Sequence, residues 1–161
     1  GLFPASWKAM VRLRDEGRIR SIGVSNFQPA HIRQLIDETG VTPAVNQIEL
    51  HPDFAQSELR DFHKLHGIVT EAWSPLGRGE ALGNAVVAGI AEKHRRMPAQ
   101  VILRWEVQLG IVPIPKSANP ARIAANRDVF DFTLDADDMA ALAGLDRGHR
   151  LGGDPDIYEE F

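Results

Sequence analysis

IVPIPKSANPARIAAN, residues 111–126, contains the pattern of a strand, a turn and the beginning of a helix. The apolar run 111–114 predicts a short buried strand that stops at Pro115. Asn119 and Pro120 then predict a helix start, because an Asn side chain caps free backbone N–H groups and proline suits the first helical position. A strand that leads directly into a helix is a βα unit, the repeating element of parallel α/β folds.

The same alternation runs through the rest of the chain. Short β-branched runs bounded by turn residues predict four strands, at 19–25, 44–50, 67–74 and 110–115. Apolar residues at helical spacing predict helices at 4–16, 29–39, 57–66, 84–96, 98–109, 120–126 and 135–145. In the helix at 57–66, Leu59, Phe62 and Leu65 are expected to point inward. Four βα units in succession predict an α/β fold with a parallel sheet.

The number of units leaves two architectures open. A closed (β/α)₈ barrel needs roughly 200–250 residues, and this chain has 161. The remaining choices are a small open α/β sheet and the second half of a barrel. No glycine-rich phosphate loop opens the first unit, which disfavours an open dinucleotide-binding sheet.

Composition excludes several classes of protein. The net charge of −4 and pI near 5.8 disfavour a nucleic-acid-binding surface, which requires a basic patch. No apolar run approaches the roughly 18–20 residues of a membrane span, and no signal peptide is recognised. With no cysteine, the chain is expected to be cytoplasmic. Because it begins without Met, it is expected to be a piece of a longer gene product.

Polar residues stand at or near the end of each predicted strand, where parallel α/β folds keep their functional sites. They are Ser25 and Asn26; Asn46, Gln47 and Glu49; Glu71, Trp73 and Ser74; and Lys116 and Ser117. Each alone is typical of a buried polar group or a helix cap, but four sets in succession favour a site.

The last of these sets has the chemistry of an anion site. Lys116 provides a point charge, and the Arg122 guanidinium provides a planar fork suited to phosphate oxygens. Arg122 and Asn126 lie four residues apart and share one helix face. Free N–H groups at the helix start are expected to add to the attraction. The alternative is a capped surface helix with two solvated charges.

Four segments together resemble the C-terminal half of the aldo-keto reductase family, and in particular its bacterial 2,5-diketo-D-gluconate reductase-type members. They are RSIGVSNF at 20–27, NQIELHP at 46–52, WSPLGRG at 73–79 and VPIPKSANPARIAAN at 112–126. The resemblance implies a (β/α)₈ TIM-barrel fold, of which this chain is the second half, with about four βα units. It also implies a single partial domain over 1–161, in which 146–161 form the C-terminal loop.

The same resemblance implies NADPH as cofactor, an aldehyde or ketone as substrate, and a set of cofactor-binding residues. By the family pattern, Ser25, Asn26 and Gln47 hold the nicotinamide carboxamide, and Trp73 stacks on the nicotinamide ring. Ser74, Leu76 and Gly77 line the pyrophosphate. Lys116, Ser117 and Arg122 take the 2′-phosphate, and Asn126 takes the adenine. Ala125 departs from the pattern, since many relatives have an acidic residue there.

No catalytic residue is assigned in this chain. The family protonates the carbonyl oxygen with a Tyr aided by Lys, Asp and His, and the one tyrosine here, Tyr158, lacks the family motif around it. The chain alone is therefore expected to be inactive. The alternative function is a non-catalytic NADPH- or phosphate-binding module or a partner-binding subunit. Exposed barrel edges predict that the chain pairs with a missing N-terminal half or with itself.

Further expectations concern the histidines and the C-terminal tail. His51 is expected to be structural, and His63 and His66 lack the further ligands that a metal site needs. Asp135, Asp137 and Asp138 are expected to stabilise a helix start. In the tail, Arg147, His149 and Arg150 are expected either to meet a substrate carboxylate or to be disordered.

Overall fold

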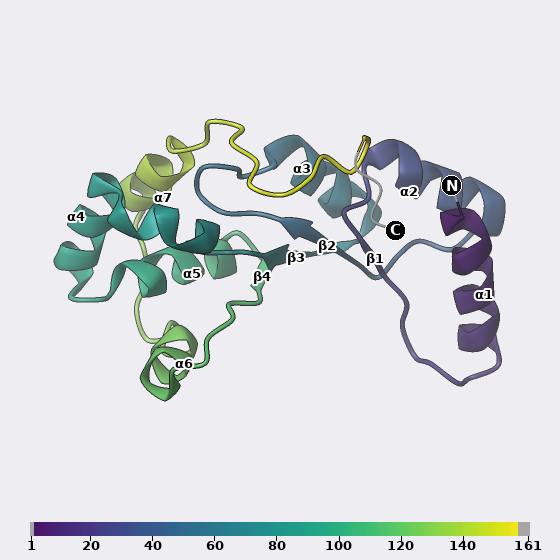
Figure 1. Cartoon of the computed structure of the whole chain (residues 1–161), viewed down its shortest axis with the longest axis horizontal. Helices are drawn as coiled ribbons and strands as arrows, with labels where there is room; N and C mark the ends of the chain where they lie inside the picture. The colour runs from purple at the N-terminus through teal and green to yellow at the C-terminus, as the bar shows by residue number, and fades with distance from the viewer. Residues whose placement is uncertain (1, 158–161) are drawn as a thin grey trace. The chain divides into compact units, whose positions relative to one another are not determined.

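The computed structural model describes residues 2–157, which form two compact units. The first unit contains residues 2–48, 57–70 and 153–157; the second contains 49–56 and 71–152. The strand order is the sequence order, β1-β2-β3-β4 (Figure 1). No helix within residues 2–157 combines the length and apolar character needed to cross a membrane. The single-domain assignment stays a prediction.

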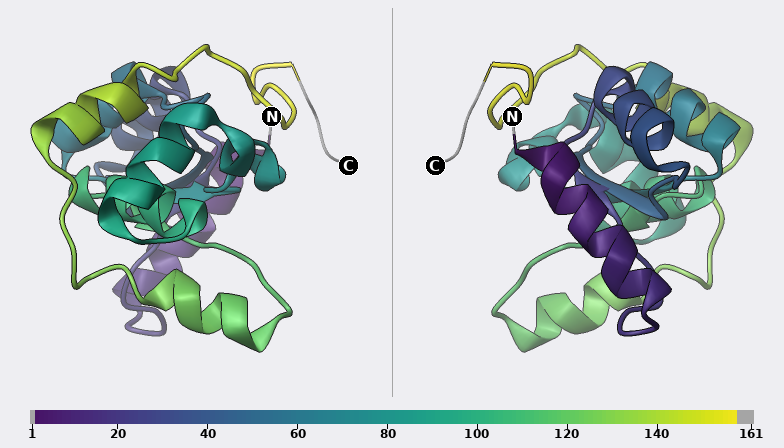
Figure 2. Two further views of the ribbon diagram at one scale, coloured as in Figure 1. Left: turned by 90° about the vertical axis from the view of Figure 1, so that its left-hand side faces the viewer. Right: turned by 90° about the vertical axis from the view of Figure 1, so that its right-hand side faces the viewer.

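Three helices and two paired strands build the first unit. They are α1 (Phe3–Asp15), β1 (Val24–Ser25), α2 (Pro29–Thr39), β2 (Val45–Glu49, whose last residue belongs to the second unit) and α3 (Ser57–His66). Trp7 of α1 packs with Ile22 and with Leu35 of α2, and all three side chains are buried. The Trp7 indole N–H donates to Thr39 Oγ1 at 3.1 Å, so α1 is fixed to α2 by both apolar and polar contacts. Figure 2 shows α1 in its right-hand view, in purple.

Helices α2 and α3 have the bounds that the sequence predicts. Pro29 occupies the first position of α2, and Gly40 ends it with φ 68°, the left-handed conformation that glycine adopts without steric cost. Leu59 and Phe62 of α3 are buried as expected. The prediction for Leu65 is wrong, because its side chain is 81% exposed.

Strands β1 and β2 are parallel, with Val24 opposite Asn46 and Ser25 opposite Gln47. The predicted strand at 19–25 is longer than the observed β1, which comprises two residues. Apolar, β-branched composition is a preference for a half-buried surface, and it does not fix how many residues find a partner strand.

The second unit contains the remaining elements. They are the continuation of β3 (Val69–Trp73), the 3₁₀ stretch η1 (Gly77–Gly83), α4 (Ala85–His94), α5 (Pro98–Gln108), β4 (Val112–Pro113), α6 (Pro120–Arg127) and α7 (Ala136–Ala143). β3 and β4 are parallel, with Glu71 opposite Val112 and Ala72 opposite Pro113. Strand β4 is short because Pro113 and Pro115 have no N–H to donate to a ladder. The predicted parallel α/β class is confirmed.

Helices α4 and α5 pack against each other, and α5 carries much of the core of the second unit. Its Val101, Ile102 and Leu103 side chains are buried, as is Trp105. The Gln108 side-chain amide holds the segment after α6, since its Nε2 donates to Leu134 O at 3.0 Å and its Oε1 accepts from Leu134 N at 2.8 Å.

The η1 stretch was not predicted. Gly77, Arg78 and Gly79 in succession have φ angles of 56°, 53° and 99°. Two glycines make this left-handed run feasible, and Arg78 adopts it between them. This left-handed run begins at Gly77, shortly after β3 ends at Trp73, and so it shapes the surface at the carboxyl end of that strand.

Candidate functional site

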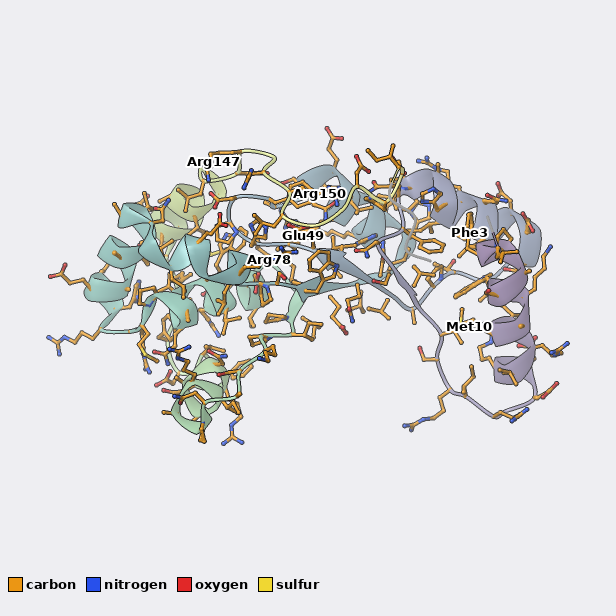
Figure 3. The ribbon with its side chains drawn as sticks, viewed as in Figure 1. Phe3, Met10, Glu49, Arg78, Arg147 and Arg150 are labelled. Carbon is orange, nitrogen blue, oxygen red and sulfur yellow. The ribbon has the colours of Figure 1, made fainter. Side chains whose placement is uncertain are left out.

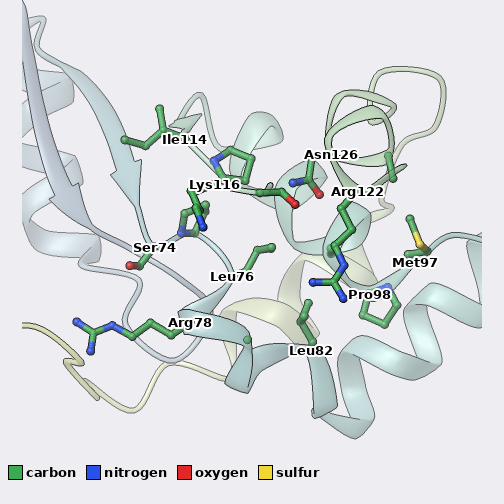
Figure 4. Close-up of a pocket in the computed structure, with 16 residues that line it drawn as sticks. Ser74, Leu76, Arg78, Leu82, Met97, Pro98, Ile114, Lys116, Arg122 and Asn126 are labelled. Carbon is green, nitrogen blue, oxygen red and sulfur yellow. The ribbon is translucent and has the colours of Figure 1, made fainter. Parts of the chain in front are cut away.

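A pocket of about 670 Å³ opens at the carboxyl ends of β3 and β4 in the second unit (Figure 4). Its lining comes from the segment after β3, the start of α5, the segment after β4, and α6. Six predicted site residues line it: Ser74, Leu76, Lys116, Ser117, Arg122 and Asn126. The structure thus brings the predicted phosphate-binding residues together around one cavity.

The lining of this pocket combines apolar and cationic side chains. Leu82, Met97 and Pro98 supply apolar surface. In Figure 4 the Arg122 side chain extends from α6 toward Leu82 and Pro98. No acidic side chain within residues 2–157 pairs with the Lys116 ammonium or the Arg122 guanidinium. An anion entering the pocket would therefore meet two cations that no carboxylate of residues 2–157 neutralises.

The start of α6 differs from the prediction in one respect. Asn119 caps the helix as expected, and its Oδ1 accepts from Ala121 N at 2.9 Å and Arg122 N at 3.2 Å. Ser117 Oγ accepts from Asn119 N at 3.1 Å. These N–H groups are therefore engaged within the chain, and attraction for an anion comes chiefly from the two cationic side chains.

The other predicted residues of this unit occupy different surroundings. Trp73, the last residue of β3, is half-buried and does not line the pocket. Gly77 is buried, and a Cβ there would lie 3.6 Å from the His51 ring. Ser74 has φ 52°, a conformation that costs energy for a residue with a side chain and that is enriched at functional sites.

Ser25, Asn26 and Gln47 lie together in the first unit. Ser25 Oγ donates to Gln47 O at 2.9 Å, and Asn26 N donates to the same carbonyl at 2.9 Å. Asn26 has φ 58°, so the chain turns sharply directly after β1. Gln47 lies in the middle of β2 and not at its end. Ser25 and Asn26 are exposed at this turn, and Gln47 is half-buried.

A buried polar chain supports that turn, and its only signal in the sequence was an Asn inside an apolar run. Asn46 is fully buried; its Oδ1 accepts from Phe27 N at 3.3 Å and its Nδ2 donates to Phe27 O at 2.8 Å. The same Nδ2 lies 3.0 Å from His63 Nε2, which must accept, and His63 Nδ1 is left to donate to Thr70 Oγ1 at 2.9 Å. Burial and the charge of His66 lower the pKa of His63 to about 4, so the ring is neutral.

His51 has the structural surroundings that were expected. Its ring is 1% exposed, and Nε2 lies 3.0 Å from Glu49 Oε1. In the tail, the Arg147 guanidinium lies 3.1 Å from the Asp53 carboxylate, and Arg150 stacks on the Phe54 ring. These contacts hold Arg147 and Arg150 of the tail against Asp53 and Phe54. Tyr158 lies outside the residues that the structure describes.

The acidic residues at the start of α7 do more than stabilise a helix end. Asp135 and Asp138 form a reciprocal capping pair, as expected. In addition, Lys93 Nζ lies 2.6 Å from Asp135 Oδ2 and 2.8 Å from Asp138 Oδ1, which fixes α7 to α4. Within the described residues, no three His, Asp or Glu side chains are grouped as metal ligands.

Arg78 is a charged residue of the pocket that was not predicted from the sequence. Arg78 lines the pocket and is exposed, although Figure 4 shows its guanidinium directed away from Arg122. Its place in the WSPLGRG segment was visible, but the consecutive left-handed residues that orient it were not. Asn46 and Glu49 were also recognised as polar residues within β2, but the sequence did not indicate which groups they contact.

Several known proteins are similar to this chain in sequence. The family model described as aldo/keto reductase family matches residues 3–147. An aldo-keto reductase of Mycolicibacterium smegmatis is 60% identical over 156 residues, which cover 97% of this chain and 57% of that protein. The 2,5-diketo-D-gluconic acid reductase B of Corynebacterium sp. is 54% identical, covering 100% of this chain and 58% of that protein. Methylglyoxal reductase DkgA of Escherichia coli is 51% identical, covering 97% and 58%.

Solved structures agree with these relatives. The apo crystal structure of Gox0644 superposes with a TM-score of 0.96 at 53% identity and covers 98% of this chain and 59% of that one. A Gox0644 mutant in complex with NADPH gives a TM-score of 0.93 at 54% identity, covering 96% and 57%. This chain thus spans a little under three fifths of the length of its relatives, and the predicted barrel-family fold is confirmed. On its sequence and its structure, the chain belongs to the aldo/keto reductase family.

Proposed function

We propose that this chain supplies the NADPH-binding half of a reductase that converts aldehydes or ketones to alcohols. The observation that carries it is the pocket lined by Lys116 and Arg122, which have no acidic partner within the described part of the chain, and by apolar side chains. Two cations on one side suit the 2′-phosphate that distinguishes NADPH from NADH, and the planar guanidinium suits bidentate contact. The NADPH bound in a Gox0644 structure supports the choice of cofactor.

Different residues are assigned to different parts of the cofactor. Lys116, Ser117 and Arg122 hold the phosphate, and Leu82, Met97 and Pro98 supply apolar surface beside them. We assign Asn126 to the adenine and the segment 74–77 to the pyrophosphate. Trp73 offers its ring face to the nicotinamide, which supplies the hydride when bound. Ser25, Asn26 and Gln47 are assigned to the carboxamide from the family resemblance.

The substrate class follows from the relatives. One is named a 2,5-diketo-D-gluconic acid reductase and another a methylglyoxal reductase, and both names describe small carbonyl compounds. We assign this chain to the same class of substrate. The chain alone is expected to show no carbonyl-dependent NADPH oxidation, because no residue of it is assigned as the proton donor; turnover by the purified chain would contradict this.

Arg122→Ala tests the cofactor assignment. Loss of one charge-assisted contact, worth about 1.5–3 kcal/mol, weakens NADPH binding about 10- to 100-fold and leaves NADH binding nearly unchanged. Binding is measured by fluorescence titration with each cofactor. Arg127→Ala is the matched control, since Arg127 ends the same helix and does not line the pocket. An unchanged NADPH-to-NADH preference in Arg122→Ala would contradict the assignment.

A further inference from the structure

The tail segment 147–152, which we call the strap, is fixed to the residues that follow β2 in the second unit. Arg147 N and His149 N both donate to Asp53 O, at 3.1 and 3.0 Å. The Arg147 guanidinium pairs with the Asp53 carboxylate at 3.1 Å. Arg150 Cζ lies 4.6 Å from the centre of the Phe54 ring. Figure 3 shows Arg147 and Arg150 on this segment, with Glu49 beside it.

The end of the strap is held by a fully buried carboxylate. Glu49 Oε1 accepts from Leu151 N at 2.6 Å, and Oε2 accepts from Gly152 N at 2.8 Å. Glu49 is 0% exposed, so both oxygens depend on partners within the protein. The strap amides and His51 Nε2 are those partners. Neighbouring backbone N–H groups on the two oxygens of one carboxylate form a clamp with a single geometry.

The clamped backbone lies against the ring of Trp73. A Cβ on Gly152 would stand 2.6 Å from Trp73 Cη2 and 2.8 Å from Glu49 Oε2, closer than real Cβ atoms come to other heavy atoms. Position 152 therefore has space for glycine alone unless the ring or the strap moves. The strap backbone is in contact with the far edge of the indole and limits how that ring can tilt.

We propose, on the basis of the proposed function, that Glu49 is a positioning residue which clamps the strap at 151–152 against Trp73 and so holds the indole face in place for the nicotinamide. Glu49 acts through the strap and through Trp73, and it is not assigned any contact with cofactor or substrate.

Glutamine cannot reproduce this clamp. A carboxylate accepts on both oxygens, whereas a side-chain amide accepts on one atom and donates on the other. In either orientation, the Gln amide nitrogen faces one strap N–H, donor against donor. Glu49→Gln therefore releases Leu151 or Gly152 while preserving the size and shape of the buried side chain.

Two variants of the full chain test the clamp without cofactor. Glu49→Gln removes one acceptor, and Gly152→Ala displaces the strap while leaving the carboxylate intact. The controls are Glu92→Gln and Gly89→Ala on α4; the Glu92 side chain is exposed, and a Cβ on Gly89 meets nothing within 4 Å. NMR measures amide exchange at residues 151 and 152 and the indole N–H resonances of the three tryptophans, with Trp73→Phe identifying that of Trp73.

In Glu49→Gln, exchange at residue 151 or 152 is expected to accelerate by about tenfold or more, as loss of a charge-assisted bond predicts. The Trp73 resonance is expected to shift in both strap variants, while the Trp7 and Trp105 resonances stay in place. The controls leave all of these signals unchanged. Protected strap amides in Glu49→Gln would overturn the clamp, and an unmoved Trp73 resonance in both variants would overturn its effect on the ring.

NADPH and NADH titrations then separate this inference from the proposed function. Glu49→Gln is expected to weaken both cofactors about three- to tenfold, with an unchanged NADPH-to-NADH ratio, since the nicotinamide is common to both. Unchanged affinities in a variant whose strap and Trp73 have moved would overturn the positioning role. A wild-type chain that binds neither cofactor would refute the proposed function and this positioning role together, while the exchange and indole signals still decide whether Glu49 clamps the strap.

Discussion

Gly23 shows how a single residue sets the spacing of two strands. A Cβ at this position would lie 2.3 Å from Val45 Cγ1 and 2.8 Å from Val45 O. Its φ is not in the left-handed region, so the requirement for glycine is one of space and not of backbone conformation. The close approach occurs beside the β1–β2 pair, on which the positions of Ser25 and Gln47 depend.

Gly23→Ala is therefore expected to destabilise the chain by about 1–3 kcal/mol, the usual cost of inserting a methyl group into a packed region. Val45→Ala should recover only part of this loss, because the Val45 carbonyl contact remains. Gly89→Ala, in open space on α4, should instead raise the free energy of unfolding by up to about 1 kcal/mol. Urea unfolding measures all three; equal stability of the two glycine variants would refute the steric argument.

His63 makes the stability of the first unit depend on pH. The pKa is 6.5 in the reference state and about 4 in the fold. As the pH falls from 6.5 toward 4, the unfolded chain takes up the proton first, so the free energy of unfolding decreases; the stabilisation is fully present above pH 6.5. At about 1.4 kcal/mol per pKa unit, the whole shift corresponds to about 3 kcal/mol, most of which is lost between pH 6.5 and pH 4.

His63→Gln tests this by removing the titrating group. Urea unfolding at pH 7 and pH 4.5 should give a smaller difference for the variant than for the wild type. His66→Gln is the comparison, because it retains the buried ring of His63. An equal pH dependence in His63→Gln and the wild type would show that the proton is not excluded by the Asn46–His63–Thr70 chain.

At the scale of an element, α6 shows that a helix cap and an anion site can compete. Asn119 uses two of the free N–H groups, and Lys116 and Arg122 remain as the cations. Asn119→Asp should retain the cap and the thermal stability, because a carboxylate accepts the same bonds and favours the helix dipole. It should nevertheless weaken NADPH more than NADH, since its charge lies beside the proposed phosphate site.

Asn119→Ala provides the opposite pattern. It should lower stability by about 1 kcal/mol through loss of the cap while changing the cofactor preference little. Thermal unfolding and parallel titrations with NADPH and NADH distinguish the two variants. If Asn119→Asp binds NADPH as tightly as the wild type does, the proposed phosphate does not lie near α6.

Elements were predictable to different extents. α2 and α3 follow the predicted bounds because Pro29, Gly40 and the helical spacing of apolar residues act locally. β1 is shorter than predicted because strand length depends on a partner, which local sequence does not specify, and β4 is shorter because Pro113 and Pro115 have no N–H to donate. The η1 stretch was missed because the left-handed conformation of Arg78 is disfavoured by the intrinsic preference of a residue with a side chain.

At the scale of the whole chain, the fully buried Glu106 is a source of instability. Neither of its carboxylate oxygens has a hydrogen-bond partner among the described residues, and burial raises its pKa well above the usual value of 4.5. Below pH 4.5 both states hold the proton. As the pH rises further, the unfolded state releases its proton first, so the free energy of unfolding falls until the pH exceeds the folded pKa.

Glu106→Leu should remove this pH dependence and raise the free energy of unfolding by about 1–3 kcal/mol at pH 8, because an unsatisfied buried polar group is replaced by an apolar one of similar size. Glu106→Gln is the control that removes the titration but keeps a polar group. Thermal unfolding at pH 5 and pH 8 measures both. If the stability of the wild type changes no more between these pH values than that of Glu106→Gln does, the prediction is wrong.

Exposed apolar side chains on β4 and after it lead us to expect self-association of the isolated chain. Val112 is 47% exposed and Ile114 is 41% exposed, and within residues 2–157 β4 pairs with β3 alone. Val112→Lys should shift the chain toward monomer in sedimentation, because a charge opposes pairing along an open strand edge. Val86→Lys, at an exposed position on α4, is the control. A wild-type chain that sediments as a monomer would refute this expectation.

By itself, the sequence determined the order of βα units and most helix starts and stops, because caps, prolines, glycines and periodic burial act over a few neighbours. The tertiary structure alone decided that Asn46 meets His63 and that Glu49 holds the strap at residues 151–152. Those contacts join positions far apart in the chain, and a buried polar group takes whichever partner the fold brings within hydrogen-bond distance.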